Sequence, residues 1–116
     1  MAAPKIYGIK NCDTMKKAFK WMDANGVAYD FHDYKKQEVD KDVLIAAIKM
    51  HGWENVINRR GTTWRKLPDD IKETMDENKA VEQAAANPSM IKRPLLVQGD
   101  EILLGFDEKS YENTLK

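Results

Sequence analysis

The segment that decides the fold runs from residue 5 to residue 34 and reads KIYGIKNCDTMKKAFKWMDANGVAYDFHDY. Residues 5–9 are β-prone, and the apolar residues that follow are spaced as on one face of a helix: Met15, Ala18, Phe19 and Met22. Asn25-Gly26 is a typical helix stop, which predicts a helix over about residues 13–24. Residues 27–34 then alternate as a strand with one apolar face. The segment therefore predicts two parallel strands joined by a right-handed helical crossover.

The remainder of the chain predicts a helical middle, a hairpin and a last helix. Asp40 is a suitable N-cap for a helix that ends at His51-Gly52, and short helices are expected over residues 69–78 and 81–86. Residues 95–97 and 102–104 are apolar runs around a Gly-containing turn, which predicts a hairpin, and Asp107 can cap a last helix. We predict a single α/β domain over residues 1–116 with a thioredoxin-like fold. Its four-stranded mixed sheet (about 4–34 and 91–116) carries a helical insertion (about 35–90).

Composition and charge exclude several classes of protein. The 116 residues include 19 basic and 19 acidic side chains, so the chain lacks the basic excess that is typical of general nucleic-acid and membrane-surface binders. No apolar run approaches the roughly 20 residues of a membrane span. The first residues lack the pattern of a secretory signal, so we expect a cytoplasmic protein. We also expect a monomer that binds neither nucleic acid nor a membrane.

The single cysteine, Cys12, is expected directly after the first strand and directly before the first helix. The first N–H groups of a helix lack intrahelical partners and the helix dipole adds positive potential there, so a thiolate is favoured. Cysteines at helix N-termini have pKa values lowered from about 8.5 into the range of about 3.5–7.5. The other interpretation is a small buried apolar side chain, which is usual for a lone cysteine.

Residue spacing excludes several kinds of cysteine chemistry. A phosphatase-type loop needs an arginine six residues after the cysteine, where this chain has Ala18. A dithiol motif needs a second cysteine three residues on, where Met15 stands. A lone cysteine also excludes an intrachain disulfide, and the two histidines are too distant for a zinc site. Any redox cycle at Cys12 therefore needs an external thiol.

Four segments, in order along the chain, resemble motifs of the ArsC-like family, which contains arsenate reductases, Spx transcriptional regulators and YffB-like thiol reductases. They are residues 8–18 (GIKNCDTMKKA), 58–67 (NRRGTTWRKL), 91–97 (IKRPLLV) and 104–111 (LGFDEKSY). The four segments are most similar to the YffB-like subgroup. The resemblance implies a thioredoxin-like fold with a helical insertion, which agrees with the pattern of predicted elements.

The resemblance also implies roles for particular residues. Cys12 matches the family's nucleophile, and Arg93 matches an arginine that faces it. Pro94 follows Arg93, and in thioredoxin-like folds the bond before this proline is typically cis. The expected substrate- and thiolate-binding residues are Arg60, Arg93, Pro94 and Asn11, with Arg59 as the alternative to Arg60.

Three functions follow from the resemblance. The leading one is a glutathione-dependent thiol reductase with no bound cofactor or metal, in which Cys12 attacks an oxidised substrate and glutathione, as co-substrate, resolves the adduct. The second is a glutaredoxin-coupled arsenate reductase, in which Arg60 and Arg93 hold the arsenate oxygens. The arsenate reductases use a third arginine after the last strand, where this chain has Phe106. The third is an Spx-like regulator that docks on RNA polymerase, which Met15 in place of a second cysteine disfavours.

Overall fold

The computed structural model describes residues 3–10 and 12–115, and the chain divides into two compact units. The sheet unit comprises Met1–Gln37 and Arg93–Lys116, and the helical unit comprises Glu38–Lys92. The helical unit therefore forms from one continuous stretch, whereas the sheet unit needs both ends of the chain. None of the helices within the described ranges is long and apolar enough to cross a membrane.

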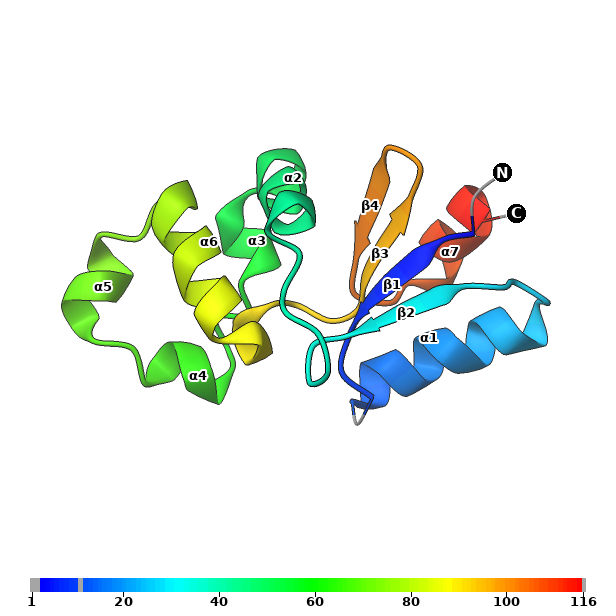
Figure 1. The fold of residues 1–116 in the computed structure, drawn as a ribbon, viewed down its shortest axis with the longest axis horizontal. Helices are drawn as coiled ribbons and strands as arrows, with labels where there is room; N and C mark the ends of the chain where they lie inside the picture. Colours follow the sequence, from blue (N-terminus) through cyan, green and yellow to red (C-terminus); the bar gives the residue numbers. More distant parts are fainter. Residues whose placement is uncertain (1–2, 11, 116) are drawn as a thin grey trace. The chain divides into compact units, whose positions relative to one another are not determined.

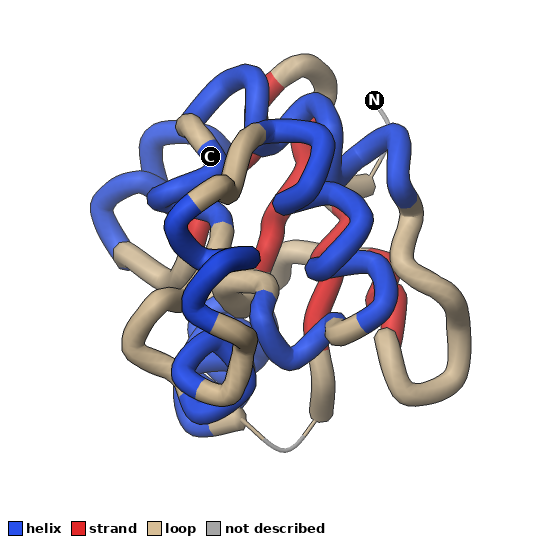
Figure 2. The backbone as a smooth tube through the Cα atoms, turned by 90° about the vertical axis from the view of Figure 1, so that its left-hand side faces the viewer, coloured by secondary structure: helices blue, strands red, loops and turns tan. Residues whose placement is uncertain are grey.

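The sheet unit has the predicted thioredoxin-like order of elements (Figure 1). They are β1 (Lys5–Gly8), α1 (Asp13–Ala24), β2 (Asp30–Asp33), β3 (Leu95–Gln98), β4 (Glu101–Leu104) and α7 (Glu108–Leu115). The strands lie in the order β2-β1-β3-β4, red in Figure 2, with β1 parallel to β2 and antiparallel to β3, and with β3 antiparallel to β4. The prediction of a mixed four-stranded sheet in an α/β fold is confirmed.

One face of this sheet carries the core of the unit. The strand register aligns a row of apolar side chains across all four strands: Phe31, Ile6, Leu96 and Leu103. Helices α1 and α7 pack on the same row, and the rings of Trp21 and Tyr111 meet edge to face with centroids 5.6 Å apart. Tyr111, Met15 and Met22 are fully buried there. Burial of this row and of the α1 face fixes the position of the first turn of α1.

Strand β2 is shorter than predicted. The alternation favoured a strand over residues 27–34, whereas the structure has only Asp30–Asp33. The reason is that the partner strand β1 has only four residues to pair with. The paired positions begin at Lys5 with Asp30 and end at Gly8 with Asp33. The N–H of Val27 instead donates to the carbonyl of Met22 at 2.9 Å, which ties the start of the predicted strand to the end of α1.

The helical unit contains α2 (Lys41–His51), α3 (Trp53–Val56), α4 (Thr62–Arg65), α5 (Asp69–Glu73), α6 (Glu77–Ala86) and the 3₁₀ helix η1 (Pro88–Met90). The predicted cap of α2 is confirmed, because the Asp40 side chain accepts hydrogen bonds from the N–H groups of Asp42 and Val43. The prediction of one helix over residues 69–78 is wrong. Asp76 accepts a hydrogen bond from the N–H of Lys79 at 2.8 Å and starts α6 four residues earlier than expected.

Candidate active site

Cys12 is the N-cap residue of α1, at the point where the chain leaves β1 for the helix. Its backbone is extended, with φ −138° and ψ 130°, and its carbonyl accepts the first helical hydrogen bond from the N–H of Lys16 at 2.9 Å. The side chain is half-buried and carries a free thiol. The prediction that the cysteine lies at the start of the first helix is therefore confirmed.

The surroundings of Cys12 favour the thiolate. Burial alone would raise the pKa of this thiol, but the N–H groups of Met15 and Thr14 and the Arg93 guanidinium act in the opposite direction, and the pKa is lowered. Arg93 acts both through its charge and through a hydrogen bond to the sulfur. The Cys12 side chain makes no capping hydrogen bond of standard geometry. The N–H groups of Met15 and Thr14 nevertheless stabilise the negative charge of the thiolate. The predicted direction of the shift is confirmed.

Arg93 opens the second segment of the sheet unit and directly precedes Pro94 and β3. The Arg93–Pro94 peptide bond is cis, as predicted. The carbonyl of Pro94 accepts a hydrogen bond from the N–H of Gly105 at 2.8 Å, which joins this turn to the end of β4. The sheet unit thus brings together the thiol of Cys12 and the cation of Arg93, which lie far apart in the sequence.

The remaining predicted site residues are not joined to the thiol by the described contacts. Arg60 belongs to the helical unit, where it is exposed and its N–H donates to the Asn58 side chain at 3.2 Å. Arg59, the alternative, places its guanidinium over the Trp53 ring at 5.9 Å. Asn11 lies outside the described residues. A role for these residues at Cys12 stays a prediction.

Phe106 stands where the arsenate reductases were expected to have a third arginine. Its ring meets the fully buried Tyr111 ring edge to face, with centroids 4.9 Å apart, and packs on the sheet-unit core. An apolar ring at this position contributes packing and supplies no charge to an oxyanion. The described part of the chain also has no group of three His, Cys, Asp or Glu side chains that could hold a metal ion.

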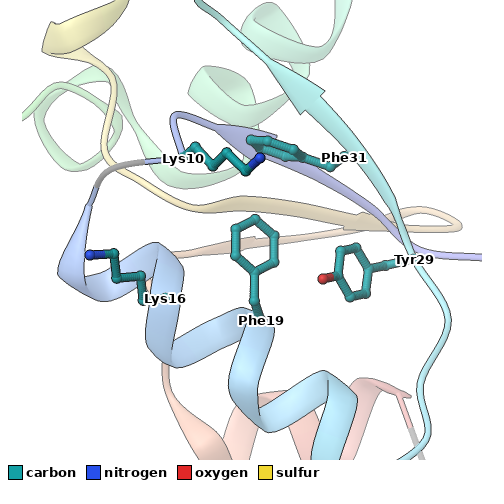
Figure 3. A pocket seen from close by; sticks show the side chains of 5 residues that line it. All are labelled: Lys10, Lys16, Phe19, Tyr29 and Phe31. Carbon is teal, nitrogen blue, oxygen red and sulfur yellow. The ribbon is translucent and has the colours of Figure 1, made fainter.

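A second feature near Cys12 was missed by the sequence analysis. A pocket of about 450 Å³ lies between α1 and β2 and is lined by Lys10, Lys16, Phe19, Tyr29 and Phe31; we call it the aromatic–lysine pocket (Figure 3). Its lysines flank Cys12 in sequence, two residues before it and four residues after it. The available signal was the apolar spacing of Tyr29 and Phe31, which predicts one apolar face of a strand but no pocket.

Comparison with known proteins identifies the family. A model of the ArsC family matches residues 7–114. The chain belongs to the ArsC family. Among solved structures, that of a protein named YffB is 50% identical in sequence and superposes with a TM-score of 0.94, covering 98% of this chain and 100% of YffB. The resemblance of the four sequence motifs to this family is confirmed.

Two further relatives carry different names. An arsenate reductase (ArsC) related protein from Brucella melitensis is 46% identical, with a TM-score of 0.75 and coverage of 99% of this chain and 96% of that one. A global transcriptional regulator Spx from Streptococcus agalactiae is 26% identical over 100 residues, which are 84% of this chain and 72% of the regulator. ArsC-family membership therefore leaves both enzymatic and regulatory functions to be distinguished.

Proposed function

We propose that the protein is a cytoplasmic, glutathione-dependent thiol reductase with Cys12 as its nucleophile. The observation that carries the proposal is the place of Cys12 as the N-cap of α1, where the N–H groups of Met15 and Thr14 and the Arg93 guanidinium lower the pKa of the thiol despite partial burial. The thiolate is the reactive form of cysteine, so these groups raise the fraction of Cys12 that is thiolate at neutral pH. The similarity to YffB over the whole chain supports the YffB-like alternative among the ArsC-family functions.

The proposed reaction has two thiol–disulfide exchanges. The Cys12 thiolate attacks the glutathione sulfur of a mixed disulfide, forms a bond to it, and releases the substrate thiol as the leaving group. A second glutathione, as thiolate, then attacks the adduct, releases Cys12 and leaves as oxidised glutathione. The net reaction converts the mixed disulfide and one glutathione into the substrate thiol and oxidised glutathione, so the substrate sulfur is reduced and the sulfur of the second glutathione is oxidised. Because Cys12 is the only cysteine in the chain, the second exchange needs this external thiol.

Cys12 and Arg93 have different roles in the proposed reaction. Cys12 touches the reacting sulfur, whereas Arg93 stabilises the thiolate before attack and again when Cys12 leaves in the second step. Its planar guanidinium also suits a carboxylate of glutathione. Arg60 and Asn11 are proposed as further substrate-binding residues on the family resemblance alone.

The test is a coupled assay that follows formation of oxidised glutathione from a small glutathione mixed disulfide. We expect turnover with the native protein, none with Cys12→Ser, and a covalent adduct of one glutathione on Cys12 by mass spectrometry when no free thiol is added. Alanine in place of Lys92, which adjoins Arg93 and is exposed, is the matched control and should leave turnover unchanged. Absence of both turnover and adduct contradicts the proposal.

Arsenate reduction is the competing activity, and the name of the Brucella melitensis relative supports it. The packing of Phe106 on Tyr111 disfavours it, because the expected third cation is replaced by an apolar ring. An Spx-like regulator is the third candidate, supported by the Streptococcus agalactiae relative. Arsenate-dependent turnover with glutaredoxin and glutathione would favour the second function, and binding to RNA polymerase without any thiol turnover would favour the third.

A further inference from the structure

The aromatic–lysine pocket has an apolar floor formed by three rings. Phe19 projects from α1, and its ring stacks with that of Tyr29 at 5.3 Å and meets that of Phe31 edge to face at 5.1 Å. All three side chains are half-buried, so each leaves part of its ring open to the pocket. Figure 3 shows the Phe19 and Tyr29 rings standing side by side, with Phe31 on the strand above them. Such a floor fits one flat apolar group.

The two lysines give one end of the pocket a positive charge. Lys10 and Lys16 are exposed, and no carboxylate within the described ranges lies at ion-pair distance from either ammonium group. In Figure 3 the Lys10 side chain reaches toward the Phe31 ring, and Lys16 lies on the first part of α1. The N-terminal end of α1 adds positive potential on the same side.

The Tyr29 hydroxyl adds a neutral polar group to the lining of the pocket. Burial raises the pKa of this hydroxyl, and the negative charge of Asp23 raises it further, so the hydroxyl stays protonated at neutral pH.

We propose that the aromatic–lysine pocket binds a small organic anion that has one flat aromatic group, such as an aromatic carboxylate or sulfonate. The ring of the ligand lies on Phe19, Tyr29 and Phe31, and its anionic group faces Lys10 and Lys16. A volume of about 450 Å³ lies within the range of small-molecule pockets, and an apolar lining with a few convergent charges is typical of them. This site uses no residue of the proposed thiol chemistry, so it stands independently of the proposed function.

The test compares two probes of nearly the same shape by isothermal titration calorimetry. 8-Anilinonaphthalene-1-sulfonate carries an anionic group, and N-phenyl-1-naphthylamine lacks it. We expect saturable one-to-one binding of the sulfonate, with an affinity about tenfold higher than that of the neutral amine, because the two exposed ammonium groups each attract the anionic group modestly. Equal affinities for the two probes, or binding that does not saturate, would overturn the proposal.

Charge-neutral variants locate the site. Lys10→Gln and Lys16→Gln should each weaken sulfonate binding by about two- to fivefold and leave binding of the amine unchanged. Lys17→Gln is the matched control, because Lys17 is an exposed neighbour on the same helix that does not line the pocket. All three positions are exposed, so the variants should fold normally. An equal loss with Lys17→Gln, or sulfonate-induced amide shifts in NMR spectra that are absent from the lining residues Lys10, Lys16, Phe19, Tyr29 and Phe31, would also overturn it.

Discussion

At the scale of single residues, the charge of Cys12 depends on one side chain and two backbone groups. Arg93→Gln removes the positive charge and keeps a hydrogen-bond donor, so we expect the pKa of Cys12 to rise toward the ordinary thiol value. The rate of iodoacetamide alkylation against pH measures this pKa directly. Lys92→Gln removes an equal charge next to Arg93 and should leave the alkylation profile unchanged. An unaltered profile in Arg93→Gln would show that the helix N-terminus alone holds the thiolate.

A substitution at a second residue, Phe106, tests whether the protein favours mixed-disulfide reduction or arsenate reduction. A well-placed charge-assisted hydrogen bond contributes about 1.5–3 kcal/mol, which corresponds to roughly ten- to a hundredfold in rate. We therefore expect Phe106→Arg to raise arsenate turnover in this range and to leave mixed-disulfide turnover near the native value. Phe106→Leu keeps an apolar side chain against Tyr111 and serves as the control. Efficient arsenate reduction by the native protein, with no gain in Phe106→Arg, contradicts the argument from the missing cation.

At the scale of elements, β1 and α1 meet at a contact that only glycine permits. A Cβ atom at Gly8 would lie 2.5 Å from the sulfur and 2.9 Å from the terminal carbon of Met15, which is fully buried. Gly8→Ala therefore forces Met15 to repack, and we expect the free energy of unfolding to fall by about 1–3 kcal/mol. Urea denaturation measures the change. In a Met15→Val background, which lacks both atoms, the same substitution should cost less.

The elements also show what the sequence was able to predict. The bounds of α1 followed from apolar spacing and from Asn25-Gly26, because both signals are local. The length of β2 did not follow from local signals, because it depends on the number of residues in β1 that pair with it. The position of Cys12 at a helix N-terminus was predictable from residue patterns. Its pairing with Arg93 came from family resemblance alone, and the aromatic–lysine pocket was missed, because both depend on tertiary contacts.

At the scale of the whole molecule, the lowered pKa of Cys12 links protonation to stability. The unfolded chain has an ordinary thiol, with a pKa of about 8.5, so the thiolate contributes its full stabilisation above that pH. The contribution is lost as the pH falls through the lowered pKa of the folded protein. We expect the free energies of unfolding of the native protein and Cys12→Ser to differ more at about pH 9 than at about pH 5. Equal differences in chemical denaturation at both pH values would contradict this linkage.

The division of the sheet unit between the two ends of the chain has a consequence during synthesis. During translation Cys12 emerges from the ribosome well before Arg93–Lys116, the segment that contains β3, β4 and α7. Without β3, the central strand β1 lacks its antiparallel partner, and the α1 face lacks Tyr111. We therefore expect the pKa of the nascent thiol to stay closer to the ordinary value until β3, β4 and α7 have emerged from the ribosome. A chain stalled on the ribosome with residue 92 as the last one exposed should be alkylated at neutral pH more slowly than the released protein. Full reactivity of Cys12 is therefore expected only after the second segment of the sheet unit has emerged and packed.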